Sequence, residues 1–511
     1  MCRLVLIFLF AVFCQPAMAA VELRITQGPL SGGSEEGVAF FKDIPYAAAP
    51  IGKLRWQAPA PALHWELTRP ARAFGPVCPQ NRRGSFFMPN LAQSEDCLSL
   101  NVWTPQANPA AKLAVMVWIH GGAFVEGGAA QPIYDGFELA QHGVVVVSLN
   151  YRLGVLGFFH HPALAASADA GSGNFGLLDQ IAALKWVRDN IAAFGGDPAK
   201  VTIFGESAGG ISVNDLVASP LARGLFIRAI SESGLGLQPV RSAADAEKAA
   251  LAFADESGIE GRDADALARL RALPVADILR RQEGMNRETA VQPYIDGSVI
   301  PEDISIAFAR GDAAKIDYLA GSNSNEASLA SAIGSDLATG PARFGPLLPK
   351  VRAIYDANGV LSEEQFEREL FNDALFGAGA YGLAAFEARH DGEAYVYHFA
   401  YLADTYRGKV PGVGHGGEIP YVFGLKGLGV LGNAASEKDR RVIALVQSYW
   451  TNFAKTGDPN AAGLPLWPRL TPGGGETLVF DDTTKAVDHF RMGQIGVMKD
   501  VWSRRTGLSA P

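Results

Sequence analysis

The stretch FGESAGG, residues 204–210, places Ser207 between Gly205 and Gly209 in the pattern G-x-S-x-G. This pattern is typical of a serine nucleophile on a sharp turn, because two residues without a Cβ let the turn tighten and its neighbours approach. The alternative is a serine in a glycine-rich helix start, since a short pattern can arise by chance in a chain with 57 glycines. The residues on either side must distinguish the two.

The flanking residues favour a nucleophile. VTIF (201–204) is a β-rich run that leads into Ser207, and ISVNDLVAS (211–219) is a plausible helix that leaves it. A strand, a tight turn and a helix project the serine from the top of a sheet and aim the helix N-terminus at the same place. We therefore predict that Ser207 is a nucleophile.

A serine hydroxyl needs a base within hydrogen-bond reach and a carboxylate that orients the base. In this strand–turn–helix context the chain order is nucleophile, acid, histidine. The histidines that fall late enough are His390, His398, His415 and His489. Only His415 lies in a glycine-rich loop, PGVGHGGEIP, that could present a ring to a cleft; the others lie in a polar turn, a strand-like run and a charged C-terminal stretch. His415 is the predicted base, and a structural loop histidine is the alternative.

The acid is less defined by pattern. KIDYLAGSNSNEAS (315–328) reads as a strand that breaks into a polar turn, with Glu326 after the turn. Sheets of this kind carry their sites at the carboxyl ends of strands, which favours Glu326. Asp317, inside the strand, and Asp296, in the turn-like YIDGS, remain alternatives.

The segment HGGAF (120–124) follows an apolar run. Its glycines would free backbone N–H groups to approach an oxyanion, although it could also be a simple turn that ends a strand.

The elements that must position these residues read as α/β. LAVMVWI (113–119) and GVVVVSL (143–149) are continuous apolar runs, as expected of strands buried on both faces. The segment from residue 175 carries apolar residues at helical spacing until Gly195 stops it. We expect a large, mostly parallel central sheet flanked by helices.

The chain has 511 residues, 48% of them hydrophobic and 19% charged, which suits a single large domain over residues 20–511. A formal net charge of -9 without a basic block argues against a nucleic-acid partner. No stretch after the N-terminal segment is a convincing membrane span, so we expect no stable membrane insertion.

Residues 1–19 read as a cleaved signal peptide: Arg3 precedes an apolar stretch too short to span a bilayer, and an A-x-A pattern ends at Ala19. A buried N-terminal helix is the alternative. Its removal would leave Cys78 and Cys97, which we expect to form a disulfide in an oxidising compartment rather than two free thiols. The chain contains no N-x-[ST] sequon, which favours a secreted or periplasmic bacterial protein.

Taken together, these motifs resemble the type-B carboxylesterases, the cholinesterase-like branch of the α/β hydrolases, and in particular their bacterial para-nitrobenzyl-esterase-like members. The matching stretches are SEDCLSLNVWTP (94–105), HGGAF, NYRLGVLGFF (150–159), GNFGLLDQ (173–180), FGESAGG, GSNSNEAS (321–328), GHGGEIPYVFG (414–424) and KTGDPN (455–460). They occur in the family's order and cover nearly the whole chain after the signal segment.

The resemblance implies an α/β-hydrolase fold with helical insertions over the active site. The residues that it assigns are the triad Ser207, Glu326 and His415, the oxyanion donors Gly122, Ala123 and Ala208, and the disulfide Cys78–Cys97. Many relatives have a third glycine where this chain has Ala123; the N–H survives this change, although the methyl group narrows the hole.

One position bears on the substrate. Cholinesterases place a tryptophan ten residues before the second cysteine, and this chain has Phe87 there, a weaker partner for a quaternary ammonium. Phe87 and Phe124 could line an apolar pocket or pack in the core, and Glu206 could attract a cation. The resemblance thus implies an exported serine esterase of small neutral esters that needs no metal or redox cofactor. The alternatives are a detoxifying hydrolase of a bulky ester, lactone or carbamate, and a non-catalytic adhesion protein on the same scaffold. The sequence does not indicate an oligomeric state.

Overall fold

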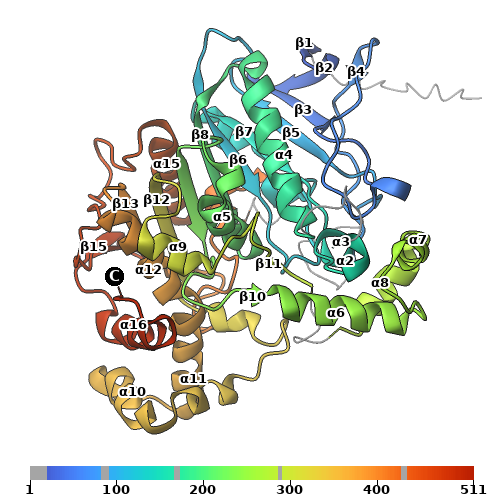
Figure 1. Cartoon of the computed structure of the whole chain (residues 1–511). Helices are drawn as coiled ribbons and strands as arrows, with labels where there is room; N and C mark the ends of the chain where they lie inside the picture. Colours follow the sequence, from blue (N-terminus) through green and yellow to red (C-terminus); the bar gives the residue numbers. More distant parts are fainter. Residues whose placement is uncertain (1–19, 82–90, 166–172, 286–290, 427–433, 511) are drawn as a thin grey trace, which may run out of the picture.

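The computed structural model of the protein describes residues 20–81, 91–165, 173–285, 291–426 and 434–510 (Figure 1). In these ranges one large sheet has the strand order β1-β2-β3-β5-β7-β6-β8-β9-β12-β13-β14-β15, with β4 paired to β2. Its strands are β1 (Val21–Ile25), β2 (Gly28–Glu35), β3 (Val38–Pro45), β4 (Arg69–Pro70), β5 (Ser99–Thr104), β6 (Leu113–Ile119), β7 (Val145–Leu149), β8 (Gly196–Glu206), β9 (Arg228–Glu232), β12 (Asp317–Asn323), β13 (Ala394–Phe399), β14 (Thr477–Phe480) and β15 (Lys485–Val487). A separate pair joins β10 (Arg241–Ser242) to β11 (Tyr294–Ile295).

The middle of the sheet is parallel. Neighbouring strands from β7 through β6, β8, β9, β12 and β13 to β14 all pair in parallel, and antiparallel pairs occur at both ends. The strand predicted at 113–119 is β6. The strand predicted at 143–149 begins two residues later as β7, because Gly143 has a φ of 79° and turns the chain before the strand starts.

Helices cover both faces, as the sequence predicts. They are α1 (Phe137–Gln141), α2 (Gly154–Gly157), α3 (Pro162–Ala165), α4 (Phe175–Asn190), α5 (Ala208–Ala218), α6 (Ala243–Glu256), α7 (Ala264–Arg271), α8 (Val275–Glu283), α9 (Ile304–Arg310), α10 (Leu348–Tyr355), α11 (Glu363–Asn372), α12 (Ala378–Arg389), α13 (Ile419–Phe423), α15 (Glu437–Thr456) and α16 (Met492–Thr506). Helices α6, α7, α8, α10 and α11 lie below the sheet as drawn in Figure 1.

Alternation along β6 explains the two-sided core. Val115 and Val117 belong to a hydrophobic cluster that includes α4 and α5, whereas Met116 and Trp118 belong to a second cluster that includes α1 and α15. Successive side chains of a strand point to opposite faces, so a continuous apolar run needs a helical layer on each side. The α/β-hydrolase architecture with a mostly parallel sheet is therefore confirmed.

The helical segment that begins at residue 175 stops at Gly195, as the sequence predicts. A 3-10 turn, η3 (Ile191–Phe194), follows α4, and Gly195 takes a left-handed conformation with a φ of 85°. The chain then enters β8, which is longer than the β-rich run 201–204 and leads to Ser207. Among the described residues, no helix combines the length and the apolar character that a bilayer crossing requires.

Candidate active site

Ser207 lies on the sharp turn between β8 and α5. It has a φ of 57° and a ψ of −122°, a conformation that costs a non-glycine residue about 1–3 kcal/mol. A Cβ on Gly205 would lie 2.6 Å from the carbonyl oxygen of Ile119, and a Cβ on Gly209 would lie 2.0 Å from the same oxygen. The two glycines are therefore required, since they let the turn and α5 press against the end of β6.

His415 and Glu326 meet beside this turn. Glu326 begins the 3-10 helix η5 (Glu326–Leu329), just after β12, and is fully buried. Its Oε2 lies 2.6 Å from Nδ1 of His415. Its Oε1 accepts hydrogen bonds of 2.6 Å from the hydroxyl of Ser233 and from the backbone N–H of Asn323. This carboxylate is held on both oxygens and can orient one tautomer of the imidazole.

The other ring nitrogen of His415 is buried and lies 3.2 Å from Oε1 of Glu206, the residue before Ser207. It has no hydrogen-bond partner among the described residues. Among the described residues Ser207 and His415 form no hydrogen bond. Such bonds are often long without substrate and tighten in the complex, so this geometry does not exclude His415 as the base. Phe376 packs on the ring, with centroids 5.2 Å apart.

Buried carboxylates control the protonation of this site. Burial lowers the pKa of His415, but the charges of Glu206 and Glu326 outweigh it and raise the pKa to about 9. Burial raises the pKa of Glu206 to about 7, although the His415 charge opposes it. Burial also raises the pKa of Glu418 to about 8, and the charges of Glu206 and Glu326 add to this. The imidazolium is thus strongly stabilised by its surroundings.

The loop after β6 lies against Ser207. A Cβ on Gly121 would be 2.7 Å from the carbonyl oxygen of Glu206 and 3.1 Å from Cβ of Ser207, so glycine is needed for this approach. Gly122 and Ala123 have φ values of 108° and 53°, and in the described chain their N–H groups have no hydrogen-bond partner. Ala208 is the first residue of α5, where a helix leaves its N–H groups unpaired. These three N–H groups are free to bind an anion.

The competing acids have other contacts. Asp317 forms an ion pair of 3.0 Å with Arg228. One oxygen of Asp296 accepts three backbone N–H groups of the turn 298–300. Among the described residues neither forms a hydrogen bond or an ion pair with a histidine, whereas Glu326 does.

The competing histidines also have other surroundings. His398 packs against Phe490, and burial and the charge of Arg491 lower its pKa to about 3. His390 contacts the carbonyl oxygen of Ala309, and His489 is an exposed neighbour of Asp488. Of the four late histidines, His415 is the one that meets a buried carboxylate beside Ser207.

Of the two phenylalanines predicted to line a pocket, the structure describes only one. Phe87 lies outside the described residues. Phe124 is buried and packs edge-on against Phe158, so the core-packing alternative describes its surroundings. Cys78 and Cys97 form a disulfide, which confirms that prediction.

Three side chains of the site were not singled out from the sequence: Ser233, Asn323 and Glu418. Asn323 and Glu418 lie in GSNSNEAS and GHGGEIPYVFG, the stretches that carry the acid and the base. Ser233 has a φ of 49°, and no sequence pattern around it predicts that conformation. Its hydroxyl reaches Glu326 across 93 residues of chain.

Comparison with known proteins places this geometry in a family. The model of the carboxylesterase family matches residues 19–342 and 353–496. The chain is 40% identical over 468 residues to para-nitrobenzyl esterase of Bacillus subtilis, covering 89% of this chain and 93% of that protein. It is 37% identical over 466 residues to fumonisin B1 esterase of Sphingopyxis macrogoltabida, covering 88% of this chain and 84% of that protein.

Solved structures agree. A para-nitrobenzyl esterase structure superposes with a TM-score of 0.81 at 35% identity, covering 93% of this chain and 99% of the other. A Geobacillus stearothermophilus carboxylesterase gives a TM-score of 0.82 at 33% identity, covering 94% of this chain and 99% of the other. The chain belongs to the carboxylesterase family and is a carboxylic ester hydrolase of the serine type.

Proposed function

We propose that the protein hydrolyses neutral carboxylic esters through an acyl-enzyme formed on Ser207, with His415 as base and Glu326 as acid. The observation that carries this proposal is the 2.6 Å contact between Glu326 and Nδ1 of His415 beside a serine at positive φ. The unpaired N–H groups of Gly122 and Ala123 support the same assignment.

The chemistry follows from these positions. His415 takes the proton of Ser207 as the serine oxygen attacks the ester carbonyl. The N–H groups of Gly122, Ala123 and Ala208 bind the oxygen that becomes negative. His415 then gives its proton to the departing alcohol, and water attacks the acyl-enzyme by the same route. Glu326 keeps the ring oriented and stabilises the imidazolium.

A neutral substrate is favoured by the surroundings of Glu206. Its carboxylate is buried and lies beside His415. Its charge therefore interacts mainly with the histidine and contributes little to binding a cationic substrate. A second candidate is hydrolysis of a bulky ester, because fumonisin B1 esterase is a relative at 37% identity. Both candidates use the same triad and differ only in the ester.

Export is part of the proposal. The apolar segment within residues 1–19 with its A-x-A pattern and the Cys78–Cys97 disulfide both suit an oxidising compartment outside the cytoplasm. Intact-mass measurement on protein from its native host should find the N-terminus at Ala20, or within a residue or two of it. A retained Met1 would overturn this part.

The test of the activity is a panel of nitrophenyl esters graded by acyl length, extended to bulky esters and to acetylcholine and butyrylcholine. We expect a higher kcat/KM for short or medium neutral esters than for the choline esters. An organophosphate should label one residue, and peptide mapping should find the label on Ser207. Label on another serine would refute the triad, and a clear choline preference would refute the neutral substrate.

A further inference from the structure

Two loops carry the acid and the base: residues 323–328, the acid loop, and residues 412–418, the histidine loop. The acid loop holds the histidine loop by hydrogen bonds that come mostly from its own side chains. They join Nδ2 of Asn323 to the Gly414 carbonyl at 3.1 Å, Oγ of Ser324 to the Val413 N–H at 2.9 Å, Oγ of Ser328 to the His415 N–H at 2.9 Å, and the Asn325 N–H to the Val413 carbonyl at 2.9 Å.

Asn323 is the member of this set that contacts both the acid, Glu326, and the histidine loop. Its backbone N–H donates to Glu326, and its side-chain amide donates both to the carbonyl of Gly414 and to the carboxylate of Glu418. Its exposed fraction is 1%. One residue thus contacts the acid, the residue before the base, and a carboxylate three residues after the base.

The chemistry of the two acceptors requires an amide here. A carbonyl and an ionised carboxylate can only accept, so the group that bonds both must offer two N–H bonds. Aspartate has the same size and offers none when ionised. Leucine fills a similar volume and offers none either.

We propose that the side-chain amide of Asn323 is a positioning group that locks the histidine loop onto the acid loop and so fixes His415 for proton transfer. This inference rests on the proposed Ser207–His415–Glu326 triad. In this role Asn323 does not contact the substrate. Misplacing a reacting group by about 1 Å can cost about 100-fold in rate, which is why a tie of this kind matters for a base on a glycine-rich loop.

The amide also affects charge. The charged groups that face His415 are Glu206 from β8, Glu326 from η5 and Glu418 from its own loop. Those that face Glu418 are Glu206, Glu326 and Glu232 from β9, with Tyr397 from β13 on the same side. The hydrogen bond from Asn323 favours the ionised form of Glu418, which in turn raises the pKa of His415. Without the amide, Glu418 is more often neutral and the pKa of His415 falls.

The experiment compares wild type, Asn323→Leu and Asn323→Asp in the full chain, with rates expressed per active site titrated by an organophosphate. We expect kcat per site to fall about 10- to 100-fold in both variants while KM changes less than about threefold. The acid limb of the pH profile of kcat/KM should move to lower pH in Asn323→Leu. It should not move to lower pH in Asn323→Asp, because a carboxylate there keeps negative charge near His415.

Asn214→Leu is the matched control. Asn214 is equally buried; it donates to the carbonyl of Leu235 and accepts from the hydroxyl of Tyr318, and within the described ranges it forms no hydrogen bond with either loop. This variant should lower the melting temperature and leave kcat per titrated site and the acid limb unchanged.

Each outcome is informative. Fewer titratable sites in Asn323→Leu with wild-type kcat per site would show a folding role alone and overturn the inference while the triad stands. Unchanged parameters in both Asn323 variants would overturn it equally. Failure of the organophosphate to modify Ser207 in the wild type would overturn the proposed triad itself, and that result is read before any Asn323 variant is measured.

Discussion

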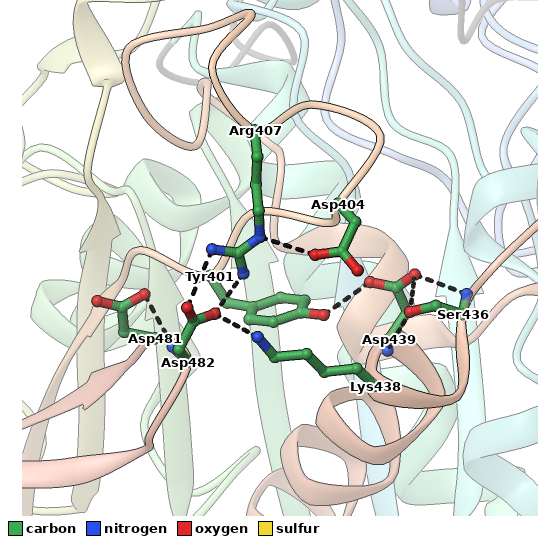
Figure 2. A network of polar contacts seen from close by, with 8 residues as sticks. All are labelled: Tyr401, Asp404, Arg407, Ser436, Lys438, Asp439, Asp481 and Asp482. Atoms are coloured by element: carbon green, nitrogen blue, oxygen red, sulfur yellow. Dashed lines mark hydrogen bonds and ion pairs between the residues drawn. The ribbon is translucent and has the colours of Figure 1, made fainter.

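Two clusters of carboxylates in the described part of the chain differ in burial. In the candidate active site Glu206, Glu326 and Glu418 are buried around His415, and Glu232 is buried facing Glu418 and Glu206. Figure 2 shows the other cluster, where Arg407 and Lys438 are both directed at Asp482 on the surface. At the surface two cations pair with the half-exposed Asp482, whereas in the buried cluster three carboxylates surround one histidine.

As a consequence, the pKa values of the carboxylates shift in opposite directions in the two clusters. Hydrogen bonds from Lys438 and Arg407 lower the pKa of Asp482 below its usual value. Burial raises the pKa of Glu206 to about 7 and that of Glu418 to about 8. Further, one oxygen each of Glu232 and Glu418 has no hydrogen-bond partner in the described part of the chain. The surface cluster therefore adds a little stability, whereas the buried cluster costs stability, as is typical of a functional site.

The largest effect on activity should come from Ser207, the proposed nucleophile beside the buried cluster. Ser207→Ala should reduce kcat by about four to six orders of magnitude, since only the N–H groups and substrate binding would remain. Its melting temperature should stay near that of the wild type because the turn keeps a Cβ. Steady-state kinetics and a thermal melt check this. Turnover near the wild-type level in the variant would contradict the assignment.

Glu418→Gln should stabilise the fold at neutral and alkaline pH. The pKa of Glu418 is raised in the folded state from 4.5 to about 8, so its contribution to stability is full below pH 4.5 and is lost as the pH rises through 8. Glutamine keeps the acceptor for Asn323 and removes this loss. The difference in unfolding free energy between variant and wild type should grow by about 3 to 4 kcal/mol from pH 5 to pH 8. Denaturant melts at the two pH values measure it, and a difference independent of pH would contradict it.

Glu206→Gln should move the acid limb of kcat/KM to lower pH by about one unit. The reason is that the Glu206 charge raises the pKa of His415, and the enzyme needs the neutral ring. Glu387→Gln is the control, because Glu387 is also buried with a pKa of about 8 but contacts Ile316 instead of the site. The profile of the control should match the wild type. A limb that stays in place in Glu206→Gln would remove Glu206 from the electrostatics of the base.

The smallest effect belongs to the surface cluster. Asp482→Asn removes a carboxylate that Arg407 and Lys438 share, yet Arg407 keeps Asp404 and the Asp482 side chain is 52% exposed. We expect a loss below about 1 kcal/mol of unfolding free energy, which shrinks as salt is added. Melts at low and high ionic strength check both statements. A loss as large as that of a buried pair would make the two clusters alike.

The fold and much of the site could be predicted because their signals are local. Continuous apolar runs such as 113–119 mark strands covered on both faces, and the glycines around Ser207 mark a turn that no side chain could enter. The sequence also pointed to His415, because a histidine among glycines differs from one in a strand. Each of these signals lies within about ten residues.

The acid of the candidate triad could not be chosen from local sequence patterns alone. Glu326, Asp317 and Asp296 were all open by pattern, and the choice among them is a matter of which one reaches a histidine 89 residues away. That proximity arises because β12 and β13 are neighbours in the sheet and their ends carry the two loops to one edge.

The sequence by itself determined the elements, the nucleophile turn and the family, because periodicity and backbone freedom are properties of short segments. Only the tertiary structure decided which polar groups share a buried space. Asn323 donates to Glu418 across 95 residues, and Ser233 donates to Glu326 across 93. Hydrogen bonds and pKa values depend on distance and burial in space, and neither quantity is set until the sheet brings distant loops together.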